Sequence, residues 1–224
     1  MRELAEQALA LDPTLAEAYA MAAIVACQYE YDYARSERLF RQALACHTVP
    51  PLVRAWYGFW LLRVTGPTEE GLELQRQAIA EDPLNYIIPF MYGITLTGAG
   101  RAEEGEAALR QALVLQPGFV AHVELALNLV AQGKVSDALR SGESAIALAP
   151  WSSYALGTLA GVTALAGDRA RSDDALRQLA ESQALDKAFG YTVAHVMRGE
   201  LEAAAEWASR TIDQRLPWIA VLLY

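Results

Sequence analysis

Residues 86–117 read YIIPFMYGITLTGAGRAEEGEAALRQALVLQP and contain two apolar-periodic segments. The first segment, residues 86–96, has no charged residue, and a Gly-Ala-Gly sequence separates it from the second. The second segment has charged residues on one face and apolar residues on the other, which is typical of an amphipathic helix. Glycine allows a tight turn between the segments, and Pro117 ends the second one. The stretch therefore predicts a hairpin of two helices.

The same pattern recurs along the chain. Pro83, Pro117 and Pro150 lie 34 and 33 residues apart (117−83 and 150−117). A fixed period of this length indicates that each copy is one structural unit that stacks on its neighbours. Two further positions recur with it, the glycine between the segments and an alanine in the second segment: Gly66, Gly100, Gly133, Gly167 and Gly199, and Ala43, Ala78, Ala112 and Ala145.

A repeat of this length, with small residues where two helices meet and proline between copies, resembles the tetratricopeptide repeat. The resemblance covers the whole chain, although the consensus tryptophan is mostly replaced and only Gly58 and Gly93 lie near the first-helix glycine position. It implies an all-α, right-handed superhelix of six helix hairpins with a half-repeat at each end. The predicted hairpins span residues 15–46, 52–81, 86–115, 119–148, 153–183 and 187–214, with a helix at 2–12 before them and the start of another at 216–224.

The composition fits one continuous domain. The chain has 224 residues, of which 54% are hydrophobic, and it has no low-complexity tract or Gly/Ser-rich linker. We therefore predict a single solenoid domain over residues 1–224. Because the chain begins and ends inside a repeat, we predict that it is a segment of a longer protein. The alternative is that another copy covers the ends of the chain. Under either interpretation we expect that the exposed terminal repeats can form a homodimer.

Charge and hydropathy argue against two classes of partner. The net charge of −9 disfavours binding to a phosphate backbone, so we expect no nucleic-acid partner. The uncharged stretch 144–167 is interrupted by Pro150, so we read it as two short helices and expect no membrane partner. The acidic residues near the N-terminus do not fit an export signal, and we therefore expect a cytoplasmic protein.

Motifs for catalysis and metal binding are missing from the sequence. His47, His122 and His195 fall in different repeats at spacings that match no metal site, and no nucleophile or phosphate-loop motif is present. Cys27 and Cys46 form no CxxC pair, so we expect free thiols. We predict that the chain is not an enzyme and holds no cofactor.

Charged residues are unevenly shared between the two helices of each hairpin. Second helices carry most of them, whereas residues 153–166 have none and residues 119–132 have only Glu124. In the repeat family that the chain resembles, first helices line the inner, concave wall. The resemblance therefore implies an apolar groove on this wall, formed by Trp56, Trp60, Arg63, Phe90, Met91, Ile94, Val123, Tyr154 and Phe189.

An apolar wall of this kind is open to three interpretations. It binds a peptide or amphipathic helix of another protein, it binds a small apolar ligand, or neighbouring repeats fill it by packing. The lysines and asparagines with which family members grip a C-terminal carboxylate are absent from the wall. We predict a non-catalytic protein-interaction or sensor scaffold, with a module for a small apolar ligand as the alternative.

A narrower resemblance concerns a few short stretches. Residues 54–62 read RAWYGFWLL, residues 199–204 read GELEAA and residues 215–218 read RLPW. These stretches resemble the C-terminal repeat region of bacterial multidomain regulators, in which a winged-helix, kinase or cyclase domain precedes the repeats. The resemblance implies a role in bacterial signalling or transcription regulation, and none of the upstream catalytic residues lies in this chain.

Overall fold

The structure is a computed structural model that describes residues 2–61, 66 and 68–214. These residues form α-helices, two π-helical turns and connecting loops, and no β-strand occurs among them. The predicted all-α class is therefore confirmed. The predicted C-terminal half-repeat at 216–224 lies outside the described residues.

The chain divides into two compact units, Met1–Gln111 and Ala112–Tyr224. The division falls inside the helix α8 (Ala102–Leu115), and each unit is described by itself. The single continuous domain therefore stays a prediction.

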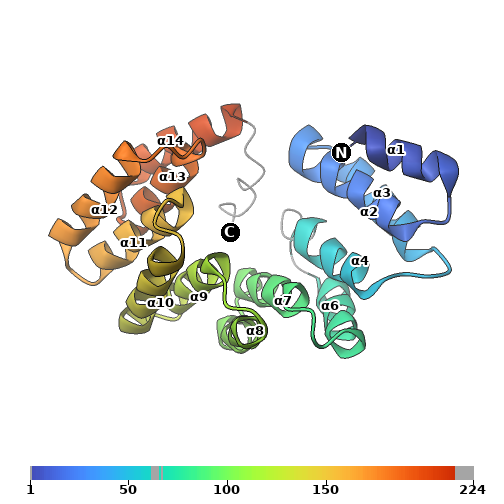
Figure 1. Ribbon diagram of the computed structural model, residues 1–224, viewed down its shortest axis with the longest axis horizontal. Coiled ribbons are helices and arrows are strands. Elements are labelled where there is room, and N and C mark those ends of the chain that lie inside the picture. Colours follow the sequence, from blue (N-terminus) through green and yellow to red (C-terminus); the bar gives the residue numbers. More distant parts are fainter. Residues whose placement is uncertain (1, 62–65, 67, 215–224) are drawn as a thin grey trace. The chain divides into compact units, whose positions relative to one another are not determined.

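In the first unit, successive helices lie against one another (Figure 1). The helix α1 packs on α2, α2 packs on α3, and α4 packs on α6, which also contacts α7. The elements are α1 (Arg2–Leu11), α2 (Ala16–Val25), η1 (Ala26–Glu30), α3 (Tyr33–Leu44), α4 (Pro51–Trp56), η2 (Tyr57–Leu61), α6 (Glu69–Glu81) and α7 (Ile87–Gly98).

Between residues 119 and 213, the second unit forms three consecutive hairpins, and the first helices of neighbouring hairpins also touch (Figure 1). The hairpins are α9 with α10, α11 with α12, and α13 with α14, while α11 contacts both α9 and α13. The elements are α9 (Phe119–Ala131), α10 (Val135–Leu148), α11 (Ser153–Leu165), α12 (Arg169–Glu181), α13 (Lys187–Met197) and α14 (Leu201–Asp213).

Local sequence explains where these helices start and stop. The side chain of Ser152 accepts a hydrogen bond from the amide of Ala155 at the start of α11, and Asp168 caps α12 through Arg171 in the same way. The turn inside a hairpin needs a residue with a left-handed backbone conformation. Glycine adopts this conformation without a steric cost, as at Gly167 with φ 85°. The observed bounds lie close to the predicted ones, so the hairpin pattern of the sequence is confirmed.

The first hairpin has a one-residue insertion around residues 29–33 relative to the repeat, and a π-helical turn accommodates it. The first helix of this hairpin continues from α2 into η1, and the amide of Tyr31 donates to the carbonyl of Ala26. Tyr31 then adopts φ 56°, a left-handed conformation that costs about 1–2 kcal/mol in a residue with a Cβ. A second π-helical turn, η2, follows α4 and was not predicted.

Replacing Tyr31 with glycine is expected to give a more stable protein than replacing it with alanine, by about 1 kcal/mol. Both substitutions remove the same ring, so the difference isolates the backbone cost at φ 56°. The order is the reverse of that in a helix interior, where alanine is the better residue. Guanidinium unfolding of the two variants checks it, and an alanine variant at least as stable as the glycine variant would contradict the assignment.

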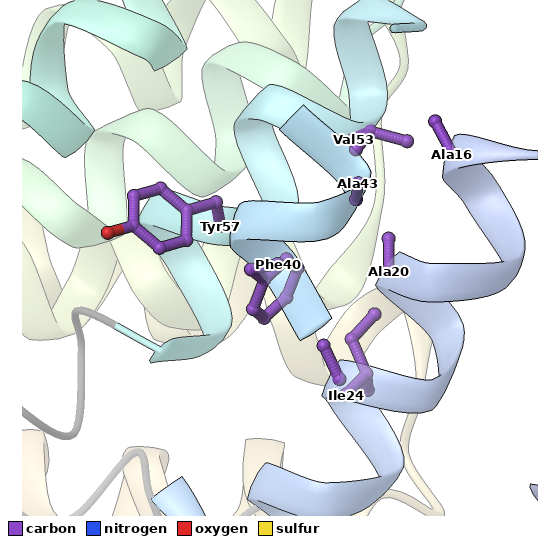
Figure 2. Close-up of a cluster of buried hydrophobic side chains, with 8 residues drawn as sticks. Ala16, Ala20, Ile24, Phe40, Ala43, Val53 and Tyr57 are labelled. Carbon is purple, nitrogen blue, oxygen red and sulfur yellow. The ribbon is translucent and has the colours of Figure 1, made fainter. Parts of the chain in front are cut away.

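Small residues in the first unit allow three helices to approach closely (Figure 2). The rings of Phe40 and Tyr57 meet edge to face with their centroids 5.6 Å apart. Ala43 lies fully buried beside them, as do the alanines at the equivalent positions 78, 112 and 145 in their own surroundings. The buried cluster consists of Ala16, Ala20, Ala23, Ile24, Phe40, Ala43, Val53 and Tyr57.

In the second unit, α11 and α13 meet through their backbones. A Cβ atom added at Gly157 would lie 2.1 Å from the carbonyl oxygen of Gly190, and one added at Gly190 would lie 2.4 Å from that of Ser153. Contacts this short leave no room for a side chain. The two helices therefore depend on glycine at these positions.

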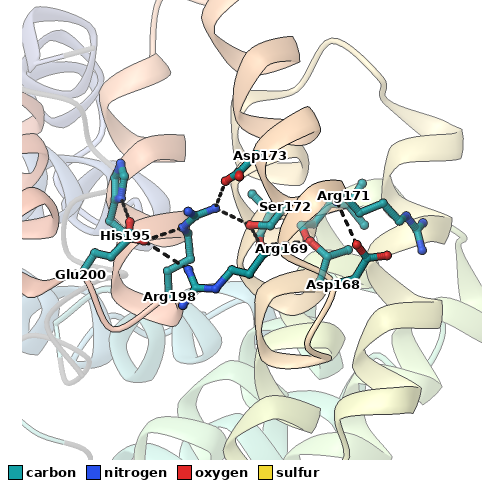
Figure 3. A network of polar contacts seen from close by, with 11 residues as sticks. Asp168, Arg169, Arg171, Ser172, Asp173, His195, Arg198 and Glu200 are labelled. Carbon is teal, nitrogen blue, oxygen red and sulfur yellow. Dashed lines mark hydrogen bonds and ion pairs between the residues drawn. The ribbon is translucent and has the colours of Figure 1, made fainter.

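A network of polar contacts joins the last two hairpins of the second unit (Figure 3). Its centre is Arg198, whose guanidinium donates to Ser172 Oγ at 2.6 Å, to Asp173 Oδ1 at 2.9 Å and to Glu200 Oε1 at 2.9 Å. Glu200 also pairs with His195 and with Arg169. The network thus connects α12 with the turn between α13 and α14.

Candidate binding wall

The predicted groove residues differ in how far they reach the surface of their unit. Trp56, Trp60, Phe90 and Tyr154 are half-buried and keep part of their side chains accessible. Arg63 lies outside the described residues. We use the name binding wall for the accessible surface of these residues on the first helices, taken separately for each unit: Trp56, Trp60 and Phe90 in the first unit and Tyr154 in the second.

The other four predicted residues lie inside the units. Val123 is 0% exposed and Phe189 is 1% exposed, while Met91 and Ile94 are also buried. Val123 packs between alanines of α10 and α11, because a first helix is covered by its own second helix and by the next first helix. The accessible part of the predicted surface is therefore smaller than the sequence implied.

In the first unit, the wall is built on the hydrophobic core. Trp56 and Trp60 both pack against the cluster of Figure 2, and each still has accessible surface. The rings of Phe59 and Trp60 meet edge to face at a centroid distance of 4.8 Å. The core therefore restrains the two tryptophans.

A short polar chain crosses from η1 to η2 behind Trp60. The thiol of Cys27 lies 3.3 Å from the carbonyl oxygen of Trp60, and the side-chain amide of Gln28 donates to the Cys27 sulfur at 3.4 Å. Burial raises the pKa of the Cys27 thiol to about 11, so at neutral pH it keeps its proton and donates to the carbonyl. Sequence reasoning missed this role of Cys27 and Gln28. The only signal was a glutamine at the end of residues 20–28, a stretch that is otherwise apolar.

In the second unit, the wall contains a tyrosine that is anchored at both ends. The ring of Tyr154 lies 4.8 Å from that of Phe189, between α11 and α13. Its hydroxyl donates to Glu124 Oε1 at 2.9 Å, on α9. Glu124 is only 8% exposed, and its lone charge on α9 is the feature by which the sequence marks it. The contact ties Tyr154 in place across two hairpins.

The arrangement offers apolar contact surface and a few hydrogen-bonding groups. Among residues 2–61, 66 and 68–214, no three His, Cys, Asp or Glu side chains gather in a way that could hold a metal ion. Within the same described part of the chain, every helix is too short or too polar to cross a membrane.

Comparison with solved structures reveals the kind of repeat. PilW, described as a widely conserved type IV pilus biogenesis factor, superposes with a TM-score of 0.61 at 23% sequence identity and covers 87% of this chain and 91% of its own. The pilF protein of Pseudomonas aeruginosa has a TM-score of 0.64 at 16% identity, covering 90% of this chain and 92% of its own. This chain has a tetratricopeptide-like repeat fold.

Yeast Tom70 is a larger protein, and part of it has the same tetratricopeptide-like fold. It superposes with a TM-score of 0.63 at 18% identity and covers 96% of this chain, which corresponds to 44% of Tom70. No protein-family model matches the chain, and no curated protein matches it by sequence. The relation to these tetratricopeptide-like structures therefore concerns the fold.

Proposed function

We propose that the chain is a non-catalytic interaction scaffold that holds a peptide or helix of another protein on its binding wall. The observation that carries the proposal is the pair of half-exposed tryptophans, Trp56 and Trp60, which are fixed on the core of the first unit. A tryptophan that packing already restrains loses little conformational freedom on binding. Such residues are common among those that contribute most of the energy of protein interfaces.

The proposal also fits the charge distribution of the first helices. Residues 153–166 have no charged side chain, and residues 119–132 have only Glu124, which is paired with Tyr154. A surface of this kind favours the apolar face of a partner over its charged face. A helix laid in a groove and an extended peptide both satisfy this requirement.

Replacing both Trp56 and Trp60 with alanine is expected to raise the dissociation constant of a wall-binding peptide about ten-fold or more. The peptide is first selected from a displayed random library on the unchanged protein. Its affinity for each variant is then measured by fluorescence anisotropy. The single change Trp56→Leu, which keeps more of the core packing, provides a variant that folds if the double change does not.

The matched control is Trp151→Ala, because Trp151 is 67% exposed on a loop of the second unit and has no place in the wall. We expect Trp151→Ala to leave the affinity unchanged. Equal losses for Trp151→Ala and for the wall variants would contradict the proposal, as would a selection that recovers no peptide. Saturable binding of a small apolar compound in place of peptides would support the alternative ligand-binding module.

We also propose that this scaffold belongs to a cytoplasmic bacterial regulator with an upstream signalling or DNA-binding domain. The support is the resemblance of residues 54–62, 199–204 and 215–218 to the repeat region of such proteins. Sequencing the coding region upstream of residue 1 tests it, and an upstream region without such a domain would contradict it.

The proposed homodimer through the terminal repeats draws on the exposed Leu4 and Leu11 of α1, and light scattering of the purified chain would test it.

A further inference from the structure

We propose that the partner segment on the binding wall of the first unit carries a lysine or arginine about one helical turn from its apolar anchor, and that the Glu17 carboxylate pairs with this basic residue. The inference rests on the proposed function and names the chemistry of the partner. Glu17 is exposed, and the apolar side chains beside it are half-buried, so a partner can reach all of them.

Two rows of accessible side chains run along the first helices of this region. On α2 the row consists of Glu17 and Met21, which lie four residues apart and therefore on one face of the helix. On α4 and η2 it consists of Leu52, Trp56 and Trp60, at the same spacing in the sequence. Met21 and both tryptophans pack against the buried cluster of Figure 2, to which α2 and α4 both contribute. The row on α2 therefore borders the binding wall.

Glu17 lies level with the first turn of α4. Glu17 is the second residue of α2, and Leu52 is the second residue of α4. Their chain neighbours, Ala16 and Val53, belong to the same buried cluster and lie close together in Figure 2. Trp56 follows Leu52 by four residues, which is about 6 Å along the helix axis. A partner with its apolar anchor on Trp56 therefore reaches Glu17 with a side chain about one turn away.

The carboxylate of Glu17 is available for such a pair. The charged residues of α2, η1, α4, η2 and α7 are Glu17, Glu30 and Arg54. Two arginines hold Glu30, and Glu81 holds Arg54 at 2.6 Å. Within the part of the chain that the structure describes, the Glu17 carboxylate forms no ion pair or hydrogen bond. It therefore lacks a counter-ion at the edge of an apolar surface.

The surroundings of Glu17 are electrostatically negative. Burial raises the pKa of the Cys46 thiol, and the charges of Asp12 and Glu17 raise it further, so both carboxylates act on this end of α2. The chain as a whole has a net charge of −9. Such a site attracts a cationic side chain and repels an anionic one. Because an acidic residue in the first turn also stabilises the helix through its dipole, the test needs a readout other than stability.

The test uses the whole chain and the displayed random library. Selection on the unchanged chain should recover peptides with a lysine or arginine four residues from an apolar anchor, or two residues from it in an extended peptide. Selection on Glu17→Lys should recover peptides with an aspartate or glutamate at that place instead. The same basic residue in both sets of peptides would overturn the inference.

Glu17→Gln should weaken the tightest peptide of the first selection about three-fold at low salt, as expected for one exposed ion pair. Replacing the basic residue of the peptide with norleucine should cost the same factor, and the two changes together should cost no more than either alone. The difference should vanish at about 1 M salt, where charges are screened over about 3 Å. Fluorescence anisotropy measures these affinities, and losses that multiply when the changes are combined would contradict the pair.

The matched control is Glu3→Gln. Glu3 is exposed in the first turn of α1, so this change removes the same charge from the same kind of helix position outside the wall. We expect it to leave the affinity for the peptide unchanged. An equal loss for Glu3→Gln would mean that net charge alone attracts the peptide, and would overturn the inference.

The outcomes separate this inference from the proposed function. If Trp56→Leu weakens the peptide while Glu17→Gln binds it as tightly as the original chain, the inference is wrong and the scaffold proposal stands. If neither change weakens the peptide, both the inference and the placing of the peptide on this wall are wrong. A selection that recovers no peptide contradicts the proposed function and, with it, the inference.

Discussion

Replacing Gly157 with alanine is expected to lower the free energy of unfolding of the second unit by about 3 kcal/mol, the upper end of the range for an overfilled core. The added Cβ would lie 2.1 Å from the Gly190 carbonyl oxygen and 2.9 Å from its Cα. These are backbone atoms of α13, so no side-chain rotation relieves the clash. The helix α13 would have to move away from α11 along their contact.

The matched control is Gly142→Ala in α10 of the same unit. Gly142 is also buried in a helix, but the nearest atom to its added Cβ is Leu159 Cδ1 at 3.9 Å, an ordinary contact distance. Alanine is the better helix former by about 1 kcal/mol, so this variant should be as stable as the original chain or more stable. Guanidinium unfolding together with hydrogen exchange of α11 and α13 measures both. Equal stability of the two variants would contradict the close approach.

The hairpins could be predicted because their causes are local. Proline, glycine and the apolar period act within about one turn of helix, and each repeats with the same spacing, so every copy supports the others. The alanine at Ala43 and its equivalents followed from the same reasoning. The buried clusters confirm that small residues lie where the helices touch.

The wall was harder to predict because exposure depends on residues far away in the sequence. Phe189 and Val123 have the same apolar character as Trp56, yet contacts with other helices bury them and leave Trp56 half-exposed. The bond between Tyr154 and Glu124 joins residues 30 positions apart. No local pattern encodes such a pair.

The π-helical turns show a further limit of sequence reasoning. A one-residue insertion is visible in the spacing near residues 29–33. The sequence does not show whether a loop, a bulge or a π-helical turn accommodates it. The sequence around the second turn, Tyr57–Leu61, shows no insertion that would predict it.

Replacing Arg198 with methionine is expected to destabilise the second unit by about 2 kcal/mol. The side chain of Arg198 is only 10% exposed, and its guanidinium donates hydrogen bonds to Ser172, Asp173 and Glu200 (Figure 3). Methionine keeps much of the apolar stem but leaves these acceptors without the donor. The cost is below that of a fully buried ion pair because Asp173 is 53% exposed and can be hydrated.

The matched control is Arg177→Met on α12. Arg177 pairs with Asp174 at 2.8 Å, but both side chains are largely exposed, at 66% and 52%. Exposed pairs of this kind contribute about 0.5 kcal/mol or less, so the control should hardly shift the unfolding midpoint. A control as damaging as Arg198→Met would show that the network of Figure 3 has no special role.

The pH dependence gives an independent check on the same network. Burial alone would raise the pKa of Glu200, but hydrogen bonds from His195 and Arg198 and their charges lower it overall. A carboxyl group with a lowered folded-state pKa stabilises the fold above its unfolded pKa of about 4.3, and this contribution is lost as the pH falls through the folded value. Without Arg198, the Glu200 pKa should move back up. The stability difference between the original chain and Arg198→Met should therefore be full at pH 7 and shrink below about pH 4, whereas a constant difference would mean that Arg198 acts through packing alone.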